Sequence, residues 1–392
     1  MHSLFRHLPF SALVGLTLLT SRATAQTFDL QDRIIGNDFF REFDWQTFDD
    51  PTHGRVNYVD MGTAMREGLA EAKDGKFVMR ADSTNVVQQG ARGRDSNRIA
   101  SQKTYTDSVI IIDVQHMPIG CATWPAFWTV TTGQWPAGGE IDIIEGINTN
   151  TQNLVSLHTT PNCTMPPQRD QTGDPTSEDC NAYVNSNQGC GTSITDPNSF
   201  GTGFNQAGGG WYALKRTQSD GVYAYFWSRN DGSVPPEVAS GSDRVNPDTW
   251  GRPDVRHPST ETCDFAQHFD AHQIVFDLTF CGDWAGNAYA QSGCGTDINA
   301  CNAFVDSNPG AFAEAYWTVN SLHVYTPSNS IPGLSPPDQS PPPPPPPGQS
   351  PPPPPPGQSP PPPPSPNNPP PPSGEQPLGL GGILPVLDPL LG

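Results

Sequence analysis

The chain has few positively charged residues and few long apolar runs. Its 392 residues include 20 lysines and arginines against 40 aspartates and glutamates, which gives a formal net charge of −20 at pH 7. Nucleic-acid binding requires clustered cations that neutralise phosphates, so we expect no nucleic-acid partner. A membrane-spanning helix needs roughly 20 consecutive apolar residues, which no segment provides. We therefore also expect no membrane insertion.

Cysteine is present, but never in the C-x-x-C pairs that zinc sites favour. The chain has eight cysteines, an even number that indicates disulfide bonds formed in an oxidising compartment. Many pairings are open, and spacing suggests only the local pairs Cys180–Cys190 and Cys294–Cys301. Asn162 begins an N-x-S/T sequon, where glycosylation would compete with a disulfide bond at Cys163.

Residues 1–25 have the composition of a secretory signal peptide. Arg6 precedes the apolar run FSALVGLTLLT, and Ala23-Thr24-Ala25 has the A-x-A form of a cleavage site. We therefore expect a mature protein that begins at Gln26 and is secreted to the extracellular space.

Proline is concentrated near the C-terminus, since 29 of the 46 prolines follow residue 330. Because proline fixes φ and lacks a backbone N–H, residues 328–392 are predicted to form a disordered, proline-rich tail of polyproline II character. Its end, LGLGGILPVLDPLLG, is interrupted by Pro385, Asp388 and Pro389 and is a poor glycolipid-anchor signal. The tail is either a dispensable extension or a spacer that tethers the protein to an extracellular surface such as a cell wall.

Residues 26–327 have the composition of one large domain. Short β-branched and aromatic runs are separated by Gly, Pro, Asn and Asp, without the strand–helix alternation of a parallel sheet. We predict an all-β fold, an antiparallel β-sandwich of jelly-roll type, with small helices near 62–72 and 298–305. The strand-like runs lie at 56–60, 76–80, 108–115, 126–130, 140–145, 154–160, 211–216, 222–229, 273–280 and 316–325.

One of these runs, in the segment GGEIDIIEG at 138–146, carries three carboxylates. Glu140 and Asp142 share one face of a regular strand, whereas Glu145 would point to the other face. A single β-bulge at Ile143-Ile144 would bring all three to one side. The two glutamate carboxyls would then lie about 5 to 6 Å apart, the spacing of a retaining glycosidase. Asp142, which is shorter, would position the nucleophile.

A solvated acidic strand face is the alternative interpretation of this segment, and the neighbouring residues weigh against it. Trp124, Phe127, Trp128 and Trp135 all precede the carboxylates within sixteen residues. Flat aromatic faces beside paired carboxylates are typical of sugar-binding sites. The combination therefore favours a glycosidase.

The segments GCATWPAFWTV at 120–130, WP at 135–136 and GGEIDIIEG at 138–146 together resemble glycoside hydrolase family 16. Within that family, the chain is similar to secreted fungal laminarinase-like endo-β-1,3(4)-glucanases, from about Phe39 to Tyr325. The extra residue between Asp142 and Glu145 looks like the bulged laminarinase form of the motif, because bacterial lichenases have the shorter E-x-D-x-E form. The proline-rich tail is not part of the family pattern.

The resemblance implies a retaining endo-β-glucanase with an open substrate cleft, acting on β-1,3-glucans such as laminarin and on mixed 1,3/1,4 glucans. It implies no cofactor and a β-glucan polysaccharide as partner. The implied roles are nucleophile for Glu140, supporting carboxylate for Asp142, general acid/base for Glu145, glucose platforms for Trp128 and Trp135, and cleft lining for Arg98, His158 and Trp284.

Several points stay open at this level. His158 is as well explained by a buried structural histidine as by a cleft residue. His268 and His272 have the i, i+4 spacing of a helical metal pair but lack the Glu of H-E-x-x-H, so we expect no metal site there. A glucan transglycosylase and a non-catalytic glucan-binding wall protein are the alternative functions. Linkage preference, tolerance of branching and calcium binding are undetermined, and we expect a monomer.

Overall fold

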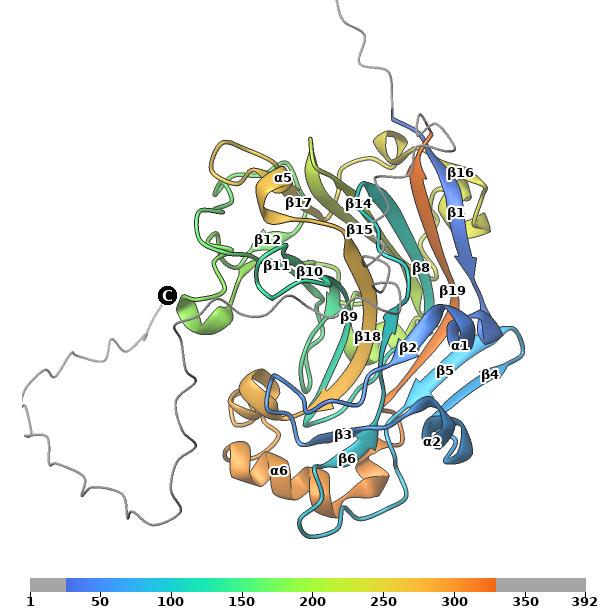
Figure 1. The fold of residues 1–392 in the computed structure, drawn as a ribbon, viewed down its shortest axis with the longest axis vertical. Helices are drawn as coiled ribbons and strands as arrows, with labels where there is room; N and C mark the ends of the chain where they lie inside the picture. Colours follow the sequence, from blue (N-terminus) through green and yellow to red (C-terminus); the bar gives the residue numbers. More distant parts are fainter. Residues whose placement is uncertain (1–25, 329–392) are drawn as a thin grey trace, which may run out of the picture. The chain divides into compact units, whose positions relative to one another are not determined.

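In the computed structural model, the described residues run from 26 to 328. The predictions for residues 1–25 and 329–392 lie outside them. Two large antiparallel sheets, of nine and eight strands, pack against each other around a shared apolar core (Figure 1). A separate pair of short strands, β3 (Val56–Tyr58) and β6 (Arg94–Ser96), is parallel. The predicted antiparallel β-sandwich is confirmed.

The strands of each large sheet come from distant parts of the chain. The nine-stranded sheet contains, in spatial order, β16 (Arg244–Val245), β1 (Phe28–Ile34), β19 (Tyr316–Pro327), β8 (Ser108–His116), β14 (Gly210–Thr217), β15 (Gly221–Ser228) and β17 (Val255–Pro258). In addition, β5 (Lys76–Arg80) pairs with β19, and β4 (Ala70–Lys73) pairs with β5. The eight-stranded sheet contains β12 (Asp174–Pro175), β13 (Cys190–Ser193), β11 (Leu154–His158), β10 (Glu140–Glu145), β9 (Thr123–Thr131), β18 (His272–Phe280), β7 (Arg98–Ser101) and β2 (Phe43–Trp45).

All ten predicted strand runs form strands, and the strands that were missed are mostly short. β2, β12, β13, β16 and β17 have two to four residues each. Such segments are too short to show the period-two alternation by which a strand is recognised. They form because neighbouring strands supply hydrogen-bond partners.

β8 explains why one long run lacks alternation. Ile110 and Ile112 point into the core between the sheets, whereas Val109 and Ile111 belong to a second apolar cluster with Val238 and Trp250 on the outer face. Because side chains alternate between the faces of a strand, a strand covered on both faces reads as continuously apolar.

The helices are short: α1 (Phe39–Glu42), α2 (Met61–Arg66), α3 (Gly201–Gln206), α4 (Pro236–Ser240), α5 (Phe265–His268) and α6 (Ile298–Ser307). α6 confirms the helix predicted near 298–305. The helix predicted over 62–72 was too long, because α2 ends at Arg66 and Gly68 has φ of +69°, a conformation that favours glycine and stops a helix. Within residues 26–328, no helix is sufficiently long and apolar to cross a membrane.

All eight cysteines form disulfide bonds, in the pairs Cys121–Cys294, Cys163–Cys263, Cys180–Cys190 and Cys281–Cys301. The predicted pair Cys180–Cys190 is confirmed. The suggested pair Cys294–Cys301 was wrong, because Cys294 bonds to Cys121, 173 residues away in sequence. Proximity in sequence is therefore a weak guide in a sandwich whose neighbouring segments come from distant parts of the chain.

Candidate active site

The site is built on β10, which lies between β11 and β9 in the eight-stranded sheet (Figure 1). The pairing of β10 with both neighbours shifts register after Asp142. The consecutive residues Ile143 and Ile144 are both buried in the core, so one extra residue is accommodated there. The predicted bulge is confirmed, and it leaves Glu140, Asp142 and Glu145 on the opposite face, called here the carboxylate face.

Asn153 satisfies the backbone groups that the bulge leaves without ladder partners. Its Oδ1 accepts a 2.9 Å hydrogen bond from the Glu145 backbone N–H, and its Nδ2 donates at 2.8 Å to the Ile143 carbonyl. The Asn153 side chain is fully buried. Since buried backbone groups without partners are strongly destabilising, Asn153 fixes both the bulge and the position of Glu145.

His158 joins the carboxylates from β11. Its Nε2 lies 3.3 Å from Asp142 Oδ2, and its Nδ1 lies 2.9 Å from Oδ1 of Asn187. Burial alone would lower the pKa of His158, but the hydrogen bond to Asp142 and the nearby carboxylates raise it to about 10. The ring is therefore protonated at neutral pH, with its Nδ1–H donating to Asn187 and its Nε2–H facing the Asp142 carboxylate. His158 is thus buried, at 7% exposure, and lies in direct contact with the supporting carboxylate Asp142.

The group of Glu140, Asp142 and His158 also has the dimensions of a metal site, since one ligand atom of each lies within 4.8 Å of the others. A metal ligand must be a neutral imidazole with a free lone pair. The raised pKa of His158 works against that state. The three residues thus fit an ion-paired triad better than a metal centre.

Glu145 has a different environment from that of Glu140. The Trp124 indole Nε1–H donates a 2.8 Å hydrogen bond to Glu145 Oε1, and Trp284 packs edge-on against Trp124 with ring centroids 5.7 Å apart. Burial and the neighbouring Asp142 charge raise the pKa of Glu145 well above its ordinary value. Glu145 therefore tends to hold a proton.

The pKa of Glu140 is also raised, to about 8, by burial and then by the Asp142 charge. The positive charges of His158 and Arg98 act in the opposite direction. Glu145 feels the His158 charge too, and the hydrogen bond from Trp124 also favours its charged form. The two glutamates therefore differ in the partners that favour their charged forms.

Trp128 and Arg98 extend the site across β9 and β7. Trp128 pairs directly with Asp142 in the sheet, and the Arg98 guanidinium carbon lies 4.8 Å from the Trp128 ring centroid. Arg98 also forms a 2.9 Å ion pair with Asp277. Burial raises the pKa of Asp277 to about 7, although Arg98 opposes the shift. Trp135 is 40% exposed and contributes a hydrogen bond that favours the charged form of Glu140.

Comparison with known proteins identifies the family. A family model described as an XgeA-like, catalytic GH16 domain matches residues 43–325. The chain belongs to glycoside hydrolase family 16.

Three relatives show how similar this family 16 chain is to known proteins. A probable endo-1,3(4)-beta-glucanase of Aspergillus niger is 39% identical over 319 residues, which cover 80% of this chain but 42% of that protein. Laminarinase 16A from Phanerochaete chrysosporium, solved with 6-O-glucosyl-laminaritriose in donor and acceptor sites, is 46% identical, with a TM-score of 0.74. An elongating family 16 beta-1,3-glucosyltransferase is 38% identical, with a TM-score of 0.71. Both structural matches cover 76% of this chain and 100% of the other.

The family 16 site contains residues that sequence reasoning did not assign to it. Trp124 was recognised as part of an aromatic cluster but not as the partner of Glu145. Asn153, Asn187 and Asp277 were not identified, because each reaches the site from a separate strand or loop and none belongs to a local motif. An asparagine shortly after the carboxylate motif, at a buried strand edge, was the only available signal for Asn153.

His268 and His272 do not share a helix, since α5 ends at His268 and β18 begins at His272. The His272 ring hydrogen bonds to Thr129 and to the Gly138 carbonyl, which gives it a structural role. His268 contacts the Asn162 carbonyl.

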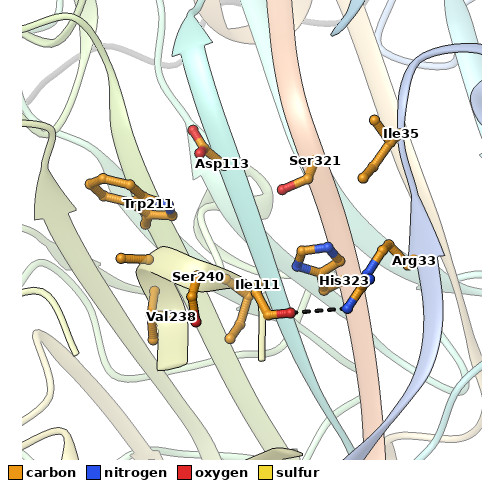
Figure 2. A pocket seen from close by; sticks show the side chains of 11 residues that line it. Arg33, Ile35, Ile111, Asp113, Trp211, Val238, Ser240, Ser321 and His323 are labelled. Carbon is orange, nitrogen blue, oxygen red and sulfur yellow. Dashed lines mark hydrogen bonds between the residues drawn. The ribbon is translucent and has the colours of Figure 1, made fainter. Parts of the chain in front are cut away.

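A hollow of about 230 Å³ lies elsewhere, on the outer face of the nine-stranded sheet (Figure 2). Its charged groups are already paired, because Asp113 binds Arg229 and Arg33 binds Asp243. It contains no pair of facing carboxylates. Catalytic function in this family 16 domain is therefore better placed at β10 than in this hollow.

Proposed function

We propose that the protein is a secreted, retaining endo-β-glucanase that hydrolyses β-1,3-glucans and mixed 1,3/1,4 glucans. The observation that carries the proposal is the bulge of β10, which brings two glutamates with different partners to one face. Glu145 has a neutral indole donor, whereas Glu140 lies beside the Asp142–His158 ion pair. Two carboxyls with separate tasks are what retaining hydrolysis requires.

In the first step, Glu145 donates its proton to the glycosidic oxygen while the Glu140 carboxylate attacks the anomeric carbon. The bond from that carbon to the leaving oxygen breaks, and a glycosyl ester of Glu140 forms. In the second step, Glu145, now ionised, takes a proton from water, whose oxygen attacks the same carbon and releases Glu140. Two displacements at one carbon restore its original configuration.

Asp142 and His158 support the nucleophile in this scheme. The imidazolium of His158 balances the charge of Asp142 at 3.3 Å and favours the charged form of Glu140. Asn187 accepts from the other ring nitrogen and so holds the orientation of the ring. Contacts that hold supporting residues in place in this way preorganise charges before the reaction begins.

The similarity to Laminarinase 16A supports a β-1,3-glucan substrate, and that to an Aspergillus niger relative supports endo-1,3(4) action. The similarity to a beta-1,3-glucosyltransferase supports a second candidate, transfer of the glycosyl intermediate to another glucan. In that case a sugar hydroxyl replaces water in the second step. Four disulfide bonds support secretion.

The test is digestion of linear β-1,3-glucan, branched laminarin and lichenan side by side, with and without an acceptor oligosaccharide. Hydrolysis predicts release of reducing ends from the wild type and loss of that release in Glu140→Gln, while glucan binding persists. Products longer than the substrate would favour transfer. Binding without any new product in the wild type would indicate a non-catalytic glucan-binding protein.

A further inference from the structure

Phe48 is an exposed aromatic ring next to the carboxylate face. Its side chain is 47% exposed, although large apolar rings usually lie inside a protein. Among residues 26–328, the other aromatic side chains of comparable exposure are Trp135, beside Glu140, and Tyr183. An exposed ring with a fixed position beside a sugar site needs a physical explanation.

Arg98 connects Phe48 to the site. The Arg98 guanidinium carbon lies 5.2 Å from the Phe48 ring centroid and 4.8 Å from that of Trp128. Arg98 itself is only 8% exposed and links the half-buried Trp128 ring to the exposed Phe48 ring. Because Arg98 is ion-paired with Asp277, the guanidinium beneath Phe48 is already neutralised, which suits a neutral polyhydroxylated ligand better than an ionic one.

The segment that carries Phe48 is held in place by hydrogen bonds. Gln46 donates its backbone N–H to the Arg98 carbonyl at 2.9 Å, and its side chain accepts from Arg98 Nε at 2.8 Å. Arg92 donates to the carbonyls of Thr47 and Phe48 at 3.0 and 2.6 Å. A ring fixed in advance loses little conformational entropy when a ligand binds it.

Sheet register locates this surface relative to the proposed catalytic acid. Arg98 pairs with Asp277, Asp277 with Ala126, and Ala126 with Glu145. Three strand spacings of ~4.8 Å place the Arg98 and Glu145 backbones roughly 14 Å apart. A glucan chain that runs across the strands from β10 toward β7 extends toward Phe48, and a longer chain places more glucosyl units on that side.

We propose that Phe48 is a sugar-binding platform that takes a glucosyl unit of a β-glucan chain, remote from the bond that is cleaved. This inference rests on the proposed function and adds to it a residue that selects long chains. The apolar face of a glucose ring packs on the phenyl ring, and its hydroxyls meet the half-buried side chain of Gln46.

The experiment compares kcat/KM on laminaritetraose and laminariheptaose for the wild type, Phe48→Leu and Phe48→Tyr. Met65→Ala is the control, since Met65 is 54% exposed on α2. Phe48→Leu keeps apolar bulk but removes the flat ring, so we expect a loss of about 5- to 10-fold on the heptaose. The loss should be below about twofold on the tetraose. Phe48→Tyr and Met65→Ala should match the wild type, and unchanged melting temperatures should show intact folding.

An equal loss on both oligosaccharides, or none on the heptaose, would overturn the inference while leaving the proposed function intact. If the wild type cleaves neither oligosaccharide, the proposed function is wrong. Calorimetric titration of laminariheptaose then still decides the role of Phe48. Weaker binding by Phe48→Leu than by Met65→Ala supports the platform, and equal binding contradicts it.

Discussion

The indole N–H of Trp124 and the carboxyl oxygen Oε1 of Glu145 are joined by a 2.8 Å hydrogen bond. The bond fixes the orientation of Glu145 and favours its charged form, against the burial that favours its neutral form. Trp124 is itself held by edge-on packing of Trp284. Both the position and the acidity of Glu145 therefore depend on Trp124.

Replacing Trp124 by Phe keeps an aromatic ring against Trp284 but removes the hydrogen bond. We expect kcat to fall by about tenfold. Because the bond lowers the pKa of Glu145, its loss should move the basic limb of the kcat/KM–pH profile to higher pH. Trp250→Phe is a matched control, since it breaks a Trp–Glu hydrogen bond to Glu237 on the outer face. A basic limb that moves to lower pH in Trp124→Phe would contradict this role.

Glu140→Gln and Glu145→Gln are each expected to lower turnover of β-glucan by several orders of magnitude while the protein stays folded. They should differ on an activated aryl glucoside, whose leaving group needs no acid. On that substrate, Glu145→Gln should keep most of its glycosylation rate, measured as a burst of aryl alcohol, and Glu140→Gln should not. Equal losses in the two variants would refute the assignment of roles.

Asn153→Ala removes the two hydrogen bonds that hold the bulge. We expect the free energy of unfolding to fall by about 2 to 4 kcal/mol. We also expect activity to fall by more than the smaller fraction of folded protein explains. Asn205→Ala is the matched control, because Asn205 bonds the backbone N–H and carbonyl of Met117, away from the carboxylates. Denaturant unfolding and kcat should show that only Asn153→Ala impairs the catalysis of folded protein.

The three carboxylates and the bulge could be predicted from sequence because they lie within one strand, where side-chain period and residue count decide which face each carboxylate takes. The disulfide between Cys121 and Cys294 could not, since it joins segments that are neighbours only in the folded sandwich. The same holds for the contacts of Asn153 and Asn187 with the site. Short strands such as β7 were missed because hydrogen-bonding neighbours, and not their own sequence pattern, make them strands.

Glu140→Gln should also change how stability depends on pH. The pKa of Glu140 in the folded protein, about 8, lies above its ordinary value of 4.5. The contribution of the protonated carboxyl to stability is thus fully present below about pH 4.5 and is lost as the pH rises through about 8. Glutamine stays neutral throughout. At pH 9 the free energy of unfolding of the variant should therefore exceed that of the wild type by about 1 to 3 kcal/mol, a range reduced because solvent reaches part of the site.

The stability difference between Glu140→Gln and the wild type should shrink toward zero at pH 4. Urea unfolding at both pH values measures it, and Glu71→Gln on β4, an exposed position, controls for the change in net charge. A wild type more stable than Glu140→Gln at pH 9 would show that ionisation of Glu140 does not destabilise the folded protein.

The central claim is that Glu140 and Glu145 carry out two successive displacements at one carbon. The most direct test is ¹H NMR of the first-formed product during hydrolysis of a linear β-1,3-glucan, before the new reducing end mutarotates. We predict that the β-anomer appears first and that the α-anomer follows at the rate of mutarotation. An α-anomer that appears first would show a single displacement by water and would contradict the mechanism.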